Sequence, residues 1–146
     1  MPLNPPRDDT GAVVPHDDPA IEGDSSLVRH INPDFHIVPD ENIGGRRVSS
    51  NAFSATNGDP QYGMSVDIGQ LLSELGLGEG GMVPPGMGAV RLRVNAVRGL
   101  ALMVGSDPEP DNAAHGQVWG VKSSKRPKIH KVVEDWVIAI PGVAIR

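Results

Sequence analysis

Residues 89–97 read Ala-Val-Arg-Leu-Arg-Val-Asn-Ala-Val, and this segment has the clearest periodicity in the chain. Val90, Leu92 and Val94 alternate with two arginines and an asparagine. Because successive side chains of a strand point to opposite faces of its sheet, the alternation predicts a strand with one buried and one solvent-facing side. The apolar run at 100–104 and the segment 115–121 predict two further strands nearby.

Working outward, short β-prone runs predict strands at 27–31, 35–38, 46–53, 64–66 and 137–140. A helical spacing of leucines and isoleucine after Asp67 predicts a helix over 68–75 with Asp67 as its N-cap. Ser124 is interpreted as the cap of a second helix over 125–136. The sequence therefore predicts an α+β fold with a small mixed, mostly antiparallel sheet, two helices and an extended N-terminal arm.

Composition divides the chain into two parts. Residues 1–25 are rich in proline and acidic side chains and lack an apolar period, which predicts a disordered or extended arm. Residues 26–146 are expected to form a single α+β domain. The Gly-rich segment 76–88 is interpreted as a long flexible connection.

Composition also excludes several classes of protein. The chain has no cysteine, which excludes disulfides and thiolate chemistry. No apolar run is long enough for a membrane span. The residues after Met1 lack the apolar stretch that a secretory signal contains. A cytoplasmic location without membrane contact is therefore expected. No common nucleotide-binding or hydrolase motif is present.

The candidate catalytic residues are His115, Arg29 and Ser50. His115 lies between the stiff polar loop 107–112 and a strand, where an imidazole suits general acid–base chemistry, and Asp111 or Asn112 is expected to orient it. Small polar side chains at strand ends can position a phosphate or ribose. The candidate ligand-binding residues are accordingly His30, Ser49, Asn51 and Asn112. The alternative is that all of these are ordinary loop and edge-strand residues.

A metal site is a further hypothesis. His30 and His36 flank a turn that contains Asp34, so two imidazoles and a carboxylate can converge there on zinc or iron. The alternative is a pair of surface histidines. No cofactor is identified by the sequence.

One basic cluster interrupts an acidic chain of net charge −5. It is either a solvated surface or a weak contact for a nucleotide or nucleic acid. Its cations are Lys122, Lys125, Arg126, Lys128 and Lys131.

Two resemblances add to this interpretation. The strings Arg29-His-Ile, Ser-Ser-Asn-Ala-Phe53, Met-Ser-Val-Asp67 and the segment 107–116 resemble a family of small uncharacterised bacterial proteins. The order of an arginine, a pair of serines and a late amide is similar to ADP-ribosyltransferases of the arginine–serine–glutamate type. That similarity implies dinucleotide binding by Arg29 and Ser49 or Ser50, with Gln117 in place of the glutamate that activates the ribose.

Two functions remain open from the sequence. The first is a cytosolic binding or accessory subunit of a larger bacterial protein system, which contacts another protein or a second copy of itself through the arm. The second is a small enzyme or binding domain for a nucleotide or phosphate-bearing substrate, with a polar cleft around Arg29, Ser50 and His115. Whether the chain is an enzyme is left undecided at this point.

Overall fold

A computed structural model describes residues 3–146 of the chain. Its main element is a six-stranded sheet in which every neighbouring pair of strands is antiparallel. In spatial order the strands are β6 (Met103–Ser106), β7 (His115–Trp119), β4 (Met64–Ile68), β1 (Ser26–Ile31), β5 (Gly88–Arg93) and β8 (Asp135–Ile138).

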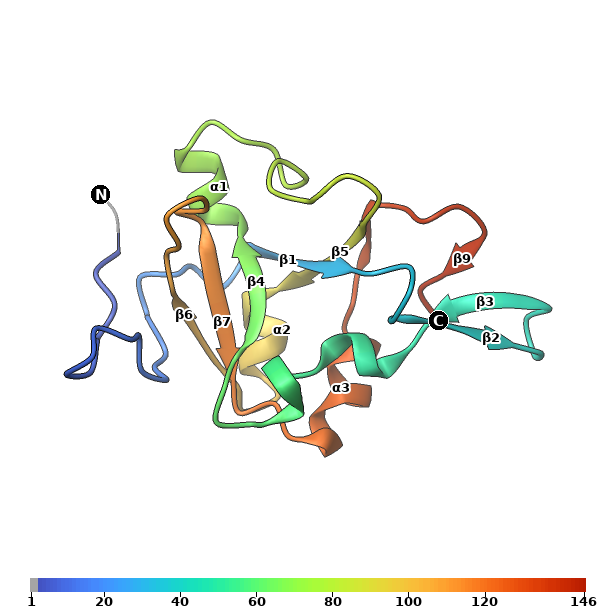
Figure 1. Cartoon of the computed structure of the whole chain (residues 1–146), viewed down its shortest axis with the longest axis horizontal. Helices are drawn as coiled ribbons and strands as arrows, with labels where there is room; N and C mark the ends of the chain where they lie inside the picture. The colour runs from blue at the N-terminus through green and yellow to red at the C-terminus, as the bar shows by residue number, and fades with distance from the viewer. Residues whose placement is uncertain (1–2) are drawn as a thin grey trace.

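A smaller sheet projects from one end of the molecule (Figure 1). It consists of β2 (Ile37–Asp40), β3 (Gly45–Val48) and β9 (Val143–Ala144), and the β3–β9 pair is parallel. The helical elements are α1 (Gly69–Glu74), α2 (Val94–Arg98), α3 (Arg126–Lys131) and the 3-10 turns η1 (Ser50–Phe53), η2 (Thr56–Gly58) and η3 (Ser123–Lys125). The α+β class and the mixed, mostly antiparallel sheet are confirmed. None of the helices in the described residues is long and apolar enough to cross a membrane.

The central strand β1 separates the sheet into two halves. It pairs with β5 along its whole length, but with β4 only at Leu27↔Ile68 and Val28↔Asp67. Beyond Val28 the two strands diverge, and β4 and β7 cross the direction of β1 and β5 (Figure 1). The side chains of Arg29 and His30, which follow Val28 in β1, lie in the opening between β1 and β4.

The structure corrects several predicted boundaries. The strand expected over 89–97 ends at Arg93, and residues 94–98 form a short third helix, α2, that the sequence analysis missed. The helix expected over 125–136 ends at Lys131, because Asp135 and Trp136 pair with β5 as the start of β8. The strand expected over 46–53 ends at Val48, and η1 begins two residues later at Ser50.

The N-terminal arm contains no strand or helix within residues 3–25, and it packs along the edge strand β6. The backbone N–H of Asp18 donates to the Val104 carbonyl at 2.9 Å, and the Val104 N–H donates to the Asp17 carboxylate at 2.9 Å. The side chain of Ile21 is fully buried in the core. The arm is therefore extended and covers an exposed sheet edge, which is a common means of preventing edge-to-edge association.

Candidate active site

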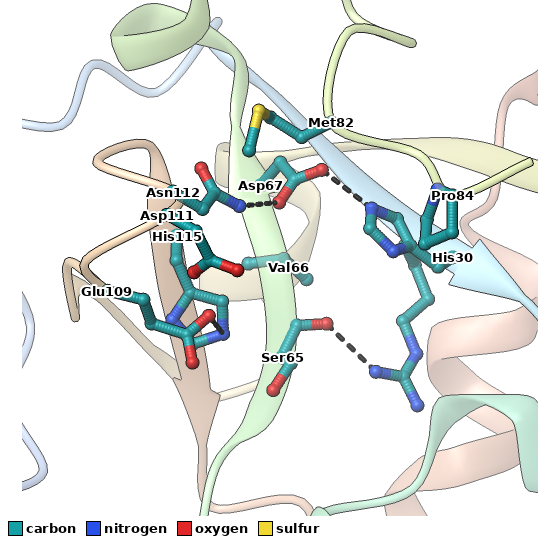
Figure 2. Close-up of a pocket in the computed structure, with 11 residues that line it drawn as sticks. His30, Ser65, Val66, Asp67, Met82, Pro84, Glu109, Asp111, Asn112 and His115 are labelled. Atoms are coloured by element: carbon teal, nitrogen blue, oxygen red, sulfur yellow. Dashed lines mark hydrogen bonds and ion pairs between the residues drawn. The ribbon is translucent and has the colours of Figure 1, made fainter.

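A polar cavity of about 330 Å³ lies in the opening between β1 and β4. Strands β1, β4 and β7 and the loops 76–87 and 107–112 supply its walls, and Figure 2 shows the side chains that face it. The lining residues are Arg29, His30, Ser65, Val66, Asp67, Met82, Pro84, Glu109, Asp111, Asn112 and His115. Four of the eight predicted site residues are thus brought together: Arg29, His30, Asn112 and His115.

Asp67 organises one side of the cavity. Its Oδ2 accepts a hydrogen bond from Nε2 of His30 at 2.7 Å, and its Oδ1 accepts one from Nδ2 of Asn112 at 2.8 Å (Figure 2). Because a carboxylate only accepts, Nε2 of His30 carries the hydrogen and Nδ1 is left as the basic ring nitrogen. The residue is 1% exposed, so both of its partners are held in place by a buried group.

The sequence analysis was wrong about Asp67. It is not a helix cap but lies in β4, and α1 begins at Gly69 without a side-chain cap. Its carboxylate is unavailable for capping because both of its oxygens are engaged with His30 and Asn112. Asp67 directly follows the β-prone run 64–66. Its position at the end of a predicted strand was the available sequence signal that it is a site residue.

His115 faces the same cavity from β7, where its Cα is paired with that of Asp67. Its Nδ1 donates to the Asp107 backbone carbonyl at 2.7 Å, so Nε2 is the free nitrogen, 3.5 Å from Oε1 of Glu109. The expectation that Asp111 or Asn112 orients this imidazole is wrong. The Asp107 carbonyl does so, and Asn112 instead orients Asp67.

Arg29 supplies the positive charge of the cavity. Its Nε donates to the Ala52 carbonyl at 2.8 Å and its Nη1 to the Ser65 carbonyl at 2.9 Å, which ties β1 to η1 and β4. Burial lowers the pKa of Arg29 to about 10, so the guanidinium still carries its charge at neutral pH. The exposed carboxylates of Glu109 and Asp111 lie on the opposite wall.

The predicted polar residues of 49–51 do not line this cavity. The Oγ of Ser49 accepts the backbone N–H of Asn51 at 3.1 Å and caps η1. Ser50 and Asn51 belong to that turn. The serine that lines the cavity is Ser65 of β4, which has the same kind of sequence context as Ser50 but was not chosen as a candidate. Its Cα partner in β7 is Gln117.

His36 is also separate from the cavity lining. Its Nδ1 accepts the backbone N–H of Asn32 at 2.9 Å, while burial and the charge of Arg29 lower its pKa to about 4. The turn residue Asp34 donates its backbone N–H to Asn32. Within residues 3–146, no three His, Asp or Glu side chains lie close enough together to hold a metal ion. The metal site that was hypothesised at His30 and His36 requires a third ligand, and the described residues supply none beside them.

The loop 76–87 forms the apolar wall of the cavity through Met82 and Pro84. Glu79 anchors this loop to β5, because its two carboxylate oxygens accept hydrogen bonds from Arg91 at 2.7 and 2.9 Å. The segment 76–88, which was interpreted as a flexible connection, is thus attached to the sheet near its N-terminal end.

The basic cluster lies on η3 and α3, outside the cavity lining. The Nζ of Lys125 donates to the Leu100 carbonyl at 2.7 Å. None of the five cations forms an ion pair within the described part of the chain. A nucleic-acid contact at this surface stays a prediction.

Comparisons with protein-family models, with curated proteins and with solved structures find no match for this chain.

Proposed function

We propose that this chain binds a ribose-containing nucleotide in the cavity and catalyses a general acid–base reaction on it. The observation that carries the proposal is the presence of two oriented imidazoles on opposite walls of one cavity. His30 is held by the buried Asp67, and His115 is held by the Asp107 carbonyl. A third group, the guanidinium of Arg29, faces the same space and can bind a phosphate.

The two histidines have different free nitrogens and suit different roles. His30 has Nδ1 free and Nε2 bound to a carboxylate, which stabilises the imidazolium that forms when Nδ1 removes a proton from a hydroxyl group or water. His115 has Nε2 free on the opposite wall, 3.5 Å from Oε1 of Glu109, and from there it can deliver a proton to a leaving group. The geometry thus supports His30 as base and His115 as acid.

Size and charge support one nucleotide unit, alone or as half of a dinucleotide, as the occupant of this cavity. A volume of about 330 Å³ lies at the lower end of the range of about 300–1,000 Å³ that small-molecule sites occupy. Arg29 suits a phosphate, while Glu109 and Asp111 suit the hydroxyl groups of a ribose or a positively charged ring. A mixed lining of this kind fits a ligand with an anionic part and a neutral or cationic part.

The resemblance to ADP-ribosyltransferases of the arginine–serine–glutamate type supports the same ligand class in a revised form. Arg29 on β1, Ser65 on β4 and Gln117 on β7 occupy neighbouring strands, with Ser65 in place of Ser49 or Ser50. The amide of Gln117 cannot act as a carboxylate, and Glu109 is the carboxylate nearest His115 at the cavity. A dinucleotide such as NAD⁺ is therefore the first ligand to test.

A role as a cytoplasmic accessory subunit that acts through protein contacts or self-association stays a prediction. Its motivation was the acidic, proline-rich arm, expected to pack on a partner or on a second copy, together with the Gly-rich loop, the uneven charge and the lack of a catalytic motif. In this structure the arm is bound to β6 of its own chain through Asp17 and Asp18, so no specific observation favours that role.

The test is calorimetric titration of the purified chain with NAD⁺, ADP-ribose and ribose 5-phosphate, followed by mass-spectrometric analysis of the products. We expect at least one of them to bind, and His30→Gln to weaken binding or turnover by roughly tenfold or more. Ser50→Ala is the matched control, because Ser50 does not line the cavity, and it is expected to behave as the wild type. Absence of binding by all three compounds, or equal loss in the control, would overturn the proposal.

A further inference from the structure

A surface of unpaired cations surrounds η3 and α3. Of the 13 lysines and arginines of the chain, four form ion pairs within the described residues, and Arg29 lies in the cavity. Six of the other eight lie in or against this helical segment, and together they are called the basic surface. They are Lys122, Lys125, Arg126, Lys128, Lys131 and Arg146.

The segment that carries the basic surface contains no neutralising carboxylate. Residues 121–133 include no aspartate or glutamate, and the next residue, Glu134, accepts a hydrogen bond from Arg93 at 3.0 Å. The whole chain nevertheless has a net charge of −5. The positive charge is therefore concentrated around α3, which lies on the opposite side of the molecule from α1 (Figure 1).

Three of these cations are free to bind an anion. Lys122, Lys128 and Lys131 are exposed, and their ammonium groups form no hydrogen bond or ion pair in residues 3–146. Lys128 and Lys131 are three residues apart in α3, so they project from one face, while Ile129 and His130 are buried. Like charges at this spacing repel each other, so an anion bound between them relieves an unfavourable contact.

Other cations of the basic surface add fixed charge. Nζ of Lys125 donates to a backbone carbonyl at 2.7 Å, and Nη1 of Arg146 donates to the carbonyls of His130 and Val133 at 3.0 and 2.9 Å. These neutral acceptors hold the side chains in place without cancelling their charge. Burial, together with the charges of Arg146 and Arg47, lowers the pKa of His130, which agrees with a positive potential at α3.

The composition of the surface favours a nucleic acid over a protein as the partner. Protein interfaces have an apolar core with aromatic anchors. In the segment 122–131 the exposed side chains are lysines, serines and a proline, and Ile129 is fully buried. Lysine ammonium groups and serine hydroxyls are typical contacts to phosphate oxygens. The segment has no aromatic residue for stacking on an unpaired base, so a duplex fits it better than a single strand.

We propose that the basic surface binds the phosphate backbone of a double-stranded nucleic acid without reading its sequence. The proposal is independent of the function proposed for the cavity, because none of the six cations lines that cavity. The three free lysines correspond to about three neutralised phosphates. The logarithm of the association constant should therefore fall with the logarithm of the salt concentration with a slope of about −3.

The test is fluorescence anisotropy of the purified chain with two labelled DNA duplexes of unrelated sequence, between about 50 and 200 mM salt. We expect both duplexes to bind with equal affinity, and we expect that affinity to fall roughly 40-fold over this range. A single strand of one duplex and a poly-glutamate peptide are compared at the lower salt concentration. We expect each of them to bind roughly fivefold or more weakly than the duplexes.

Lys128→Gln removes one free cation, and Arg7→Gln is the matched control, because it removes the same charge from an exposed residue of the N-terminal arm. We expect Lys128→Gln to reduce the magnitude of the salt slope by about 1 and to lower the affinity at the lower salt concentration about three- to tenfold. We expect Arg7→Gln to change neither. Equal losses in the two variants, tighter binding of the single strand or of poly-glutamate, or no binding of either duplex at about 50 mM salt would overturn the proposal.

Discussion

Nε2 of His30 and Oδ2 of Asp67 lie 2.7 Å apart, although the two residues belong to strands that pair at only two positions. The contact bridges β1 and β4 at the point where they separate. Asn112, from the loop after β6, binds the other oxygen of the same carboxylate. One buried side chain therefore joins three segments, and it serves both the stability of the fold and the orientation of a candidate base.

We predict that Asp67→Asn destabilises the protein by about 1–3 kcal/mol, because an asparagine cannot accept from His30 and Asn112 at once and leaves one donor unsatisfied. The free energy of unfolding from urea titration measures the effect. Asp111→Asn is the matched control. Asp111 lines the same cavity but is exposed and forms no side-chain hydrogen bond within the described residues, so we expect a change within about 0.5 kcal/mol. Equal losses in the two variants would contradict the role given to Asp67.

Stability is also predicted to fall as the pH decreases from 7 to 5, and His36 is a cause. Burial and the charge of Arg29 lower its pKa from 6.5 to about 4 in the folded chain. The unfolded chain therefore binds a proton in the window between these values while the folded chain does not, so acid favours unfolding. The acceptor role of Nδ1 toward the Asn32 N–H agrees with an unprotonated ring.

The contribution of His36 over this range is about 1 kcal/mol, reduced from the full linkage value because the ring is only half-buried. We expect His36→Asn to flatten the dependence of the unfolding free energy on pH between 7 and 5. His130, whose pKa burial also lowers, keeps part of the slope in the variant. An unchanged slope in His36→Asn would show that the pKa of this ring is the same in the folded and unfolded chains.

The strands were the most predictable part of the fold, because alternation is a local property. The segment 89–97 illustrates both the success and its limit. The alternation over Val90 and Leu92 correctly indicates β5, but the same pattern continues into residues that form α2. That helix begins where the backbone N–H groups of Val94 and Asn95 donate to carbonyls of residues 25 and 23. Such a long-range contact leaves no signal in the local sequence.

Single residues of the candidate site could be predicted from the sequence, but which of them lie next to one another could not. His115 was recognised because it lies between a polar loop and a strand, and Arg29 because of the resemblance to ADP-ribosyltransferases. Ser50 was chosen instead of Ser65. The sequence offers no basis for distinguishing them, because a serine carries no information about which strand will be adjacent to Arg29. The strand order β7-β4-β1 determines that adjacency, and it depends on tertiary packing. The role of Asp67 was hidden for the same reason, since its partners lie 37 and 45 residues away.

The loop that carries Met82 and Pro84 is predicted to loosen in Glu79→Gln. The neutral amide loses the paired hydrogen bonds to Arg91, and a partly exposed pair of this kind contributes about 0.2–1 kcal/mol. We expect amide hydrogen exchange in residues 76–87 to accelerate about two- to fivefold with little change in global stability. Glu134→Gln is the control, because it breaks a comparable pair with Arg93 outside the loop. Faster exchange of the loop in both variants would mean that Glu79 is not its anchor.

The arm is predicted to detach from the domain in Gly105→Ala. A methyl group at Gly105 would lie 2.4 Å from Nε2 of His16, so the His16 ring has to leave its contact with Trp119. Because the obstacle is a side chain of the arm rather than the sheet backbone, we expect the arm to yield while the sheet stays folded.

Limited proteolysis measures this release, with faster cleavage within residues 3–20 and an unchanged domain fragment. Gly78→Ala is the matched control, since a methyl group there meets nothing within 4 Å and the backbone does not require glycine.

The prediction also separates two views of the arm. An arm that covers β6 for stability should lower the unfolding temperature when it is released. An arm held only by the His16 contact should be cleaved without any change in that temperature. We expect the first result, because Ile21 is fully buried in the core and Arg98 donates to the carbonyl of Ile21 at 2.9 Å and to that of Asp18 at 2.7 Å.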